Sequence, residues 1–539
     1  MNPPLFSIIR KKMESKIIDH LGLVSGSWDE LQISETIDQA ITQDETCRNA
    51  SIGTLCKSLV LNGLGFTERA LYLVSDFFTN KPTSLLLGEG IEPEHLNDTV
   101  LGRALDAVQD YGTTKLFSQI SLKVVSNLGL SPSKLHMDST DFHVDGVYNS
   151  NNKPDEDSST VFITKGYSRD HRPDLNQVVL NMITDSQAGI PLHMEVLNGN
   201  CSDKTAFKKT ISKHIKELQN IAPSSFIVMD SAGYTKEGIA EFSNLTHWIS
   251  RVPESIKEAR DFITENQEWT KSEGGYQYAA KKSTYAGVQQ RWILVFSQEA
   301  FVREMKTLSK NYVQSSLKEY KIFKKISKEQ FTCEDDAKKA LLKFNKHLKF
   351  IALEDMSIRK VKQKKKSKNV KNELFCISAT VVCSIDNFKN KAISKGKFIV
   401  ATNQMDDIIF NDIAVIKGYK EQSNVERGFR FIKDPQFVAS NFFVKKPERL
   451  EALVFIMTLC LTVYAALEYK IRKALKEENQ TINNQIGKPK QNPTSRWIFQ
   501  IFSGIHILYG LEKEIVLNVK DVHLKILDLL GENYKKYYF

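Results

Sequence analysis

The stretch of sequence that decides the fold is Leu135-His136-Met137-Asp138. Its apolar and polar residues alternate as in a β-strand, with Leu135 and Met137 on one face and His136 and Asp138 on the other. The preceding residues, from about 15 to 130, instead carry apolar side chains at helical spacing. A sheet is therefore expected to begin here, and the apolar part of its first strand leads directly into a carboxylate.

A second short apolar run, Phe226-Ile227-Val228-Met229-Asp230, also ends on a carboxylate. If the two strands are neighbours, Asp138 and Asp230 converge at one edge of the sheet. The order of three strands, a helix, a strand, a helix and a strand predicts a mixed sheet with covering helices, which is an α/β fold. The other strands are expected at 178–183, 192–197 and 248–252, and the helices at 205–218 and 236–242.

The range 419–433, YKEQSNVERGFRFIK, reads as one short helix that Gly418 precedes. At about 100° per residue, Val425, Phe429 and Ile432 form an apolar stripe suited to packing on a core. A chemical face roughly 90° round the helix from this stripe carries one carboxylate with cations, an aromatic ring and an amide, which suits a site for phosphates and a metal. An ordinary amphipathic surface helix is the alternative. The chemical face consists of Tyr419, Gln422, Glu426, Arg430 and Lys433.

Asp138, Asp230 and Glu426 together form an oxygen-rich ligand set that suits Mg²⁺. Two such ions can activate a water or a 3′-hydroxyl on one side of a phosphodiester and stabilise the leaving oxygen on the other. Each residue also has an ordinary interpretation. Asp138 can cap a turn, with Asp141 or Asp145 as the ligand instead, and Asp230 can form a strand-to-helix turn.

Length and charge limit the possible classes of protein. A chain of 539 residues predicts two to four domains. The net charge of +10 and the pI of about 8.9 favour a polyanionic partner without identifying nucleic acid. A cationic run at 359–368 is either a solvated loop or a loop that contacts phosphates.

Cysteine usage and hydropathy bear on the compartment. The seven cysteines are scattered and include no CxxC pair, which argues against a disulfide framework or a zinc site and for a reducing compartment. Residues 1–12 lack the apolar core of a secretory signal. The apolar range 452–467 is shorter than the ~20 residues of a membrane span, and a buried core helix is expected there.

The sequence resembles a known family in the motif around Glu426. The signature of that family around its third catalytic acid is a Tyr, an Arg, a Glu and a Lys, separated by two, three and six residues in turn. Tyr419, Glu426 and Lys433 match this signature, and Gln422 stands at the Arg position. On this basis the chain resembles, over nearly its whole length, a bacterial insertion-sequence transposase of the DDE class, in the IS-four superfamily and its IS-sixteen-thirty-four branch. Further similar stretches are 166–175, Gly199-Asn200 with Ser202-Asp203, 431–435, and Arg69–Tyr72 with Phe77-Phe78.

The resemblance implies an RNase H-like catalytic core in which Asp138, Asp230 and Glu426 are the catalytic residues and hold Mg²⁺, or Mn²⁺ as a substitute. It implies DNA contacts by a second set of residues, in which Arg427 and Arg430 supply the cation missing at Gln422. The second set is Tyr419, Gln422, Arg427, Arg430 and Lys433.

Five parts of the chain are expected from these patterns. The N-terminal part is either a scaffold or a reader of DNA ends. The parts are a helical N-terminal domain (1–130), the first part of the RNase H-like core (131–255), a large insertion domain (256–400), the second part of the core with the Glu426 helix (401–475) and a C-terminal region (476–539).

The expected activity is binding of the terminal inverted repeats of an insertion sequence, cleavage at the element ends and joining of the 3′-hydroxyl ends to target DNA. The resemblance implies a homodimer on paired ends, no membrane partner and a bacterial cytoplasmic location, on the nucleoid during action. Two alternatives stay open: a catalytically inactive, transposase-derived DNA-binding protein, and an RNase H-like nuclease that does not join strands.

Overall fold

The computed structural model describes residues 13–43, 48–65, 73–144, 161–168, 171–223, 225–272, 274–361, 373–433, 447–510 and 513–539. Side chains at 203–206, 423, 424 and 447 also lie outside the described part. Three predicted features fall wholly or partly outside these residues: the motif at Arg69–Tyr72, most of the cationic run, and the end of the motif at 431–435.

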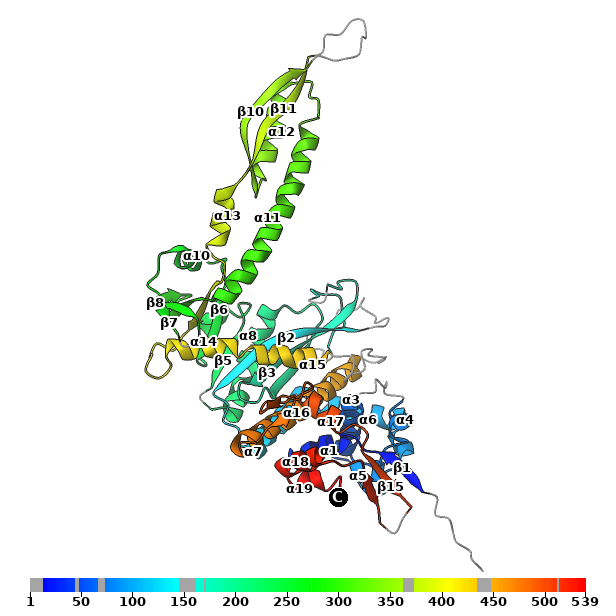
Figure 1. Ribbon diagram of the computed structural model, residues 1–539. Helices are drawn as coiled ribbons and strands as arrows, with labels where there is room; N and C mark the ends of the chain where they lie inside the picture. The colour runs from blue at the N-terminus through cyan, green and yellow to red at the C-terminus, as the bar shows by residue number, and fades with distance from the viewer. Residues whose placement is uncertain are drawn as a thin grey trace, which may run out of the picture.

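A nine-stranded mixed sheet dominates the middle of the molecule (Figure 1). In spatial order its strands are β4 (Pro191–Leu197), β3 (Asn176–Asp185), β2 (Lys134–Val144), β5 (Phe226–Met229), β6 (Trp248–Val252), β12 (Lys397–Thr402), β9 (Val288–Phe296), β8 (Gln277–Tyr285) and β7 (Thr270–Lys271).

The first five strands of this order form an RNase H-like core. β2, β3 and β4 are antiparallel neighbours, and β5 and β6 run parallel to β2. α8 (Asp203–Ile221) connects β4 to β5, and α9 (Lys236–Phe242) connects β5 to β6. All strands and helices predicted between 131 and 255 are present, so the predicted mixed α/β sheet is confirmed.

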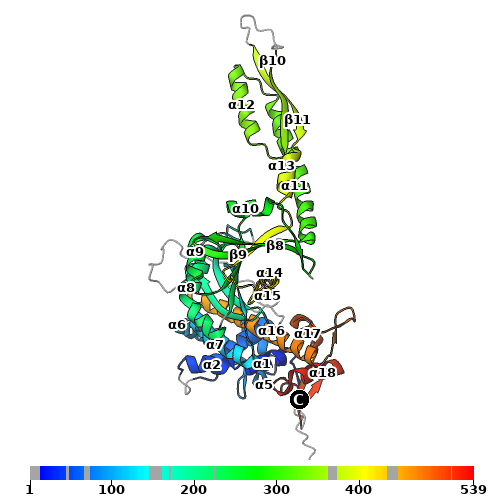
Figure 2. The ribbon, with the colours of Figure 1, turned by 90° about the vertical axis from the view of Figure 1, so that its left-hand side faces the viewer.

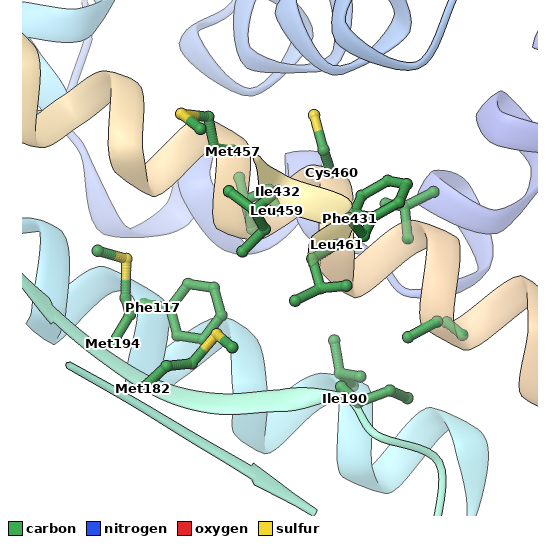
Figure 3. Close-up of a cluster of buried hydrophobic side chains, with 14 of the residues drawn as sticks. Phe117, Met182, Ile190, Met194, Phe431, Ile432, Met457, Leu459, Cys460 and Leu461 are labelled. Carbon is green, nitrogen blue, oxygen red and sulfur yellow. The ribbon is translucent and has the colours of Figure 1, made fainter. Parts of the chain in front are cut away.

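Helices cover both faces of this sheet. Met182 of β3 and Met194 of β4 are cross-strand partners, and Figure 3 shows both side chains on the side of α7 (Thr113–Leu128) and α16 (Pro447–Glu477). His193 precedes Met194, points to the other face and packs against His214 of α8, with ring centroids 4.6 Å apart. α8 therefore covers one face, and α7 and α16 cover the other.

The N-terminal helices and the C-terminal segment share one hydrophobic core with the sheet and α16. β1 (Glu14–Ile17) pairs with β15 (His506–Tyr509), which also pairs with β16 (Ile515–Leu517). Lys57 Nζ donates to Tyr537 Oη at 3.2 Å, which links the two ends again. The other elements here are α1 (Leu21–Glu30), α2 (Ile33–Ala40), α3 (Ile52–Leu64), α4 (Val74–Phe78), α5 (Thr83–Leu87), a 3₁₀ turn (Pro93–Leu96), α6 (Asp98–Tyr111), β13 (Ile482–Asn483), β14 (Pro489–Lys490), α17 (Ser495–Ile501), α18 (Asp521–Leu530) and α19 (Glu532–Lys535).

α16 lies between the sheet and these terminal helices (Figure 1). Within the described residues it is the one helix long and apolar enough to cross a membrane, and 83% of its apolar window is buried inside the protein. It packs against α1, α3, α6 and α18 as well as β4. The prediction of a buried core helix at 452–467 is therefore confirmed.

A long arm projects from the far end of the sheet (Figures 1 and 2). It has a small apolar core of its own, to which Phe323, Leu341 and Ile377 contribute. The hairpin β8–β9, which the predicted boundaries assign to the insertion, instead joins the main sheet through β12. The arm consists of α11 (Gln298–Ile326), α12 (Glu334–Lys346), β10 (Ile351–Val361), β11 (Leu374–Cys383) and α13 (Ile385–Ala392), and α10 (Lys257–Thr264) lies near its base.

The prediction of a single helix over 419–433 is wrong. The chain forms α14 (Asp412–Lys420) and α15 (Ser423–Ile432), with a break at Glu421 and Gln422. The physical reason is that the two halves pack on different surfaces: α14 lies against β5, β6, β9 and β12, whereas α15 lies against β2 and α16. Gly418, which was expected to precede the helix, lies inside α14, where an added Cβ would lie only 3.0 Å from Lys134 Cδ.

Candidate active site

Asp138 and Asp230 occupy neighbouring positions on the sheet. β2 and β5 are parallel, and Met137 is the register partner of Met229. Each aspartate is the next residue along its strand direction. Because paired strands lie about 4.8 Å apart, the two backbones run side by side at these residues. The condition attached to the sequence prediction, that the two strands be neighbours, is therefore met.

Backbone amides orient both carboxylates. Ser139 N–H donates to Asp138 Oδ1 at 2.8 Å, and Ala232 N–H donates to Asp230 Oδ1 at 2.8 Å. The second bond closes the strand-to-helix turn that was the ordinary interpretation of Asp230. Ser250 Oγ of β6 also donates to the Asp230 carbonyl at 2.9 Å, which anchors the end of β5.

Glu426 lies on a helix that crosses the face of the sheet bearing Asp138. Asp138 and Met182 are direct cross-strand partners, so their side chains point to the same face. A Cβ added to Gly428 would lie 3.8 Å from Met182 Cε. α15 thus passes over this face within two residues of Glu426.

The predicted apolar stripe holds α15 in place. Val425, Phe429 and Ile432 are all buried, whereas Glu426 and Arg430 are exposed. The stripe contributes to the same hydrophobic core as residues of α16 and β3. Figure 3 shows Ile432 of α15 in this cluster, with Leu461 of α16 and Met182 of β3. Burial of one side of the helix leaves its charged side toward solvent, where a large substrate can reach it.

Tyr419 lies within electrostatic reach of two of the three acids. Burial raises the pKa of its phenol, the Arg251 guanidinium opposes that rise, and the carboxylates of Asp230 and Glu426 add to it. Arg251 belongs to β6, two residues after the partner of Val228, and its guanidinium lies 5.7 Å from the ring centroid of Phe398. The end of β5, the end of α14 and the start of α15 therefore meet in one region.

The five predicted DNA-contacting residues differ in accessibility. Arg427 and Arg430 are exposed on α15, Tyr419 is half-buried and Gln422 is buried at the helix break. Lys433 Nζ lies 3.9 Å from Asp141 Oδ1 of β2. The exposed arginines and the lysine thus form a cationic border on the Glu426 side of the sheet.

Two residues that sequence reasoning did not assign contribute to this region. Lys134 Nζ, at the start of β2, donates to Glu421 Oε2 at 2.6 Å, and the two side chains are only 15% and 25% exposed. This ion pair ties the break between α14 and α15 to the strand that carries Asp138. The partners are far apart in sequence, so no local pattern could identify them.

Asp141, the alternative ligand on β2, has a different environment from Asp138. Its carboxylate is 3% exposed and lies 3.9 Å from Lys433 Nζ and 3.5 Å from His143 Nε2. Asp145, the other alternative, lies outside the described residues. The register beside Asp230 therefore favours Asp138 over Asp141 as its partner.

The signature glycines Gly166 and Gly199 mark a close backbone contact. A Cβ on Gly199 would lie 2.0 Å from the Gln177 carbonyl oxygen and 2.4 Å from that of Thr164. A Cβ on Gly166 would lie 2.0 Å from the Gly199 oxygen. Only glycine fits at both positions, because a side chain at either one would block this contact between two segments distant in sequence.

The donor chemistry of the three acids fits a hard divalent cation, since Mg²⁺ takes one or two carboxylates per ion and keeps several waters. Among the described residues, the one group of three potential ligand atoms all within 4.8 Å of one another is a different set, His193, Glu195 and His214. At least one pair of carboxylates among Asp138, Asp230 and Glu426 is therefore more than 4.8 Å apart.

Comparison with known proteins identifies the family. A model described as "Transposase DDE domain" matches residues 130–463, and one described as "Domain of unknown function (DUF4277)" matches residues 13–122. The first covers more than half of the chain, so the chain belongs to the DDE-domain transposase family. No curated protein matches it.

One solved structure that is similar is a cryo-EM structure of the piggyBac transposase synaptic complex with hairpin DNA. The similarity covers 90% of this chain and 80% of that chain, with 9% sequence identity and a TM-score of 0.38. The predicted DDE-class membership is confirmed by the family match. Placement in the IS-sixteen-thirty-four branch stays a prediction, as do the catalytic and DNA-contacting roles of individual residues.

Proposed function

We propose that this transposase binds the terminal inverted repeats of its own insertion sequence, cleaves at the element ends and joins the freed 3′-hydroxyl ends to target DNA. The observation that carries the proposal is the adjacent register of Asp138 and Asp230, with α15 and its Glu426 crossing the same face. Family membership supplies the reaction class, and the arrangement of these acids supplies its location on the sheet.

Each side chain has a defined part in the proposed chemistry. Asp138 and Asp230, oriented by backbone amides, provide carboxylate oxygens from the sheet, and Glu426 provides one from the helix. Divalent ions held by these carboxylates, Mg²⁺ or Mn²⁺, would activate a water or a DNA 3′-hydroxyl and stabilise the leaving oxygen. Arg427 and Arg430, exposed beside Glu426, are placed to pair with phosphates of the DNA backbone.

Glu426→Gln tests the proposal directly. The amide preserves size but removes the charge, and we expect binding to duplexes that contain the ends of the encoding element to be retained. Loss of a ligand worth several kcal/mol in the transition state should slow cleavage in Mg²⁺ by about a thousandfold or more. Glu237→Gln is the matched control, because it makes the same change from carboxylate to amide at an exposed residue of α9, and this variant should cleave normally. Normal cleavage by Glu426→Gln would refute the assignment.

The two alternative functions give different products. An inactive DNA-binding relative leaves the duplex intact with or without Mg²⁺. A nuclease that does not join strands releases cut ends but no branched or inserted product from an oligonucleotide strand-transfer reaction. The proposed activity requires both the cut ends and the joined product.

Assembly and location belong to the same proposal. We expect two copies to act on paired ends, as a homodimer on DNA in the bacterial cytoplasm, at the nucleoid. Light scattering of the protein with a single-end duplex should then give a mass of two chains and two duplexes. A complex that retains one chain and one duplex at all concentrations would contradict the dimer.

A further inference from the structure

A second group of potential ligands lies on the sheet face that α8 covers. His193 and Glu195 are two residues apart on β4 and so point to the same side, and His214 reaches them from α8. One ligand atom from each residue lies within 4.8 Å of the other two. His193 is 1% exposed and His214 6% exposed, and Glu195 is half-buried.

Two imidazole nitrogens in this group lack partners. His193 Nε2 and His214 Nε2 are buried and have no hydrogen bond. Leaving a buried polar atom unsatisfied costs about 1–3 kcal/mol. The two rings contact each other with centroids 4.6 Å apart and a 47° tilt, which positions them but satisfies neither nitrogen. Neither nitrogen has a protein partner, so a Lewis acid bound between them would remove this cost.

The surrounding residues orient the group as a ligand set. Glu217 Oε2 lies 3.1 Å from His214 Nδ1, where it can accept a hydrogen bond from Nδ1–H; in the neutral imidazole this bond leaves the lone pair on Nε2. A carboxylate behind a ligating histidine is the common arrangement at zinc sites. Thr210 Oγ1 donates to Glu195 Oε2 at 2.9 Å and itself accepts from Asn181 Nδ2 at 2.7 Å. Glu195 is thus held by a short chain of hydrogen bonds that reaches β3.

The electrostatic surroundings of the group combine burial with one nearby cation. Burial, with smaller contributions from the neighbouring His214 and Lys213, lowers the pKa of His193 to about 3. Lys213 Nζ lies 3.8 Å from Glu195 Oε1 and is a flexible, mostly exposed cation that a bound ion would displace.

We propose that His193, Glu195 and His214 bind a Zn²⁺-like transition-metal ion, with a water completing the coordination. Two nitrogens and one carboxylate suit Zn²⁺, whereas Mg²⁺ prefers oxygen ligands. Glu195 pairs with Asn181, and Asn181 pairs with Ser139, the residue after Asp138. Because successive residues alternate faces, the ion would lie on the face opposite Asp138, as a clamp between α8 and β4.

The test uses the full-length protein after removal of metals with EDTA. CoCl₂ is titrated into it, and the visible absorption of protein-bound Co²⁺ is followed. We expect one equivalent to give the intense bands of a low-coordinate nitrogen-and-oxygen site, ZnCl₂ to displace it and MgCl₂ in excess not to. ZnCl₂ should also raise the melting temperature of the protein.

Variants separate this site from the acids and from adventitious binding. His193→Gln should abolish the bands, and Glu217→Gln, which leaves all three ligands in place, should weaken binding about 10- to 100-fold. His20→Gln, at a buried histidine bonded to the Leu64 carbonyl, and Asp138→Asn should give the same intense Co²⁺ bands as the wild type. Because His193→Gln can fail to fold, Glu195→Gln is measured beside it. The proposal would be overturned if the wild type showed no saturable binding of Co²⁺. It would also be overturned if Glu195→Gln and Glu217→Gln bound Co²⁺ as tightly as the wild type.

Discussion

Gly199→Ala is the substitution whose effect the structure defines most sharply. The added methyl group would lie 2.0 Å from the Gln177 oxygen and 2.4 Å from the Thr164 oxygen. These oxygens belong to the main chain, so no rotamer change relieves the clash. The Thr164–Gln177 bridge, with N–O distances of 3.3 and 3.0 Å, must open or shift by more than an ångström.

The expected cost follows from these contacts. Overpacking typically costs 1–3 kcal/mol, and weakening two backbone hydrogen bonds adds about 0.5–1.5 kcal/mol each. We expect a loss of about 3 kcal/mol in the free energy of unfolding, which is roughly a hundredfold in the equilibrium constant. Urea unfolding should show a lower midpoint, and hydrogen exchange at the Thr164 and Gln177 amides should accelerate even where unfolding is irreversible.

Gly274→Ala is the matched control. The nearest side-chain atom to an added Cβ there is 3.5 Å away, an ordinary van der Waals distance, and we expect a change within about 0.5 kcal/mol. If Gly199→Ala matches this control in both urea midpoint and amide exchange, the close approach of the two signature motifs is not the reason that glycine stands there.

Three further predictions concern pH, an ion pair and DNA. Burial lowers the pKa of His20 to about 4, so as the pH falls from about 6.5 toward 4 the unfolded chain takes up a proton that the folded chain does not. The free energy of unfolding should therefore fall by roughly 3 kcal/mol over this pH range. His20→Gln should flatten that part of the curve when the urea midpoint is plotted against pH. Glu421→Gln should lose about 1–2 kcal/mol of stability because it removes the charge paired with Lys134 at 2.6 Å; an unchanged midpoint would show that the pair does not hold the break between α14 and α15. Neutralising the cationic run at 359–368 should reduce the slope of log affinity against log salt for DNA by about 0.9 per lost phosphate contact, and an unchanged slope would place that loop away from DNA.

Local patterns predicted much of this molecule. Alternation identified β2, and a short apolar run bounded by turn residues identified β5, because strand periodicity and burial act within a few residues. The stripe of Val425, Phe429 and Ile432 likewise predicted the buried side of α15. The order of the acids, read with the signature around Glu426, led to the correct family.

Other features depend on pairings between distant segments. The sequence could not show that Met137 pairs with Met229, or that β8, β9 and β12 extend the main sheet beyond β6. The predicted single helix breaks at Gln422 because its halves pack on different strands. No periodic signal in the chain encodes such a competition between packing surfaces.

By itself, then, the sequence determined most of the strands and helices of the core and which of their faces are apolar, and it suggested which acids to propose for the DDE pattern. Tertiary structure alone decided which strands are neighbours, where α15 crosses the sheet and that His193, Glu195 and His214 come together. The physical reason is range: propensity and periodicity act between residues three or four apart, whereas strand pairing and helix packing join residues separated by tens to hundreds of positions.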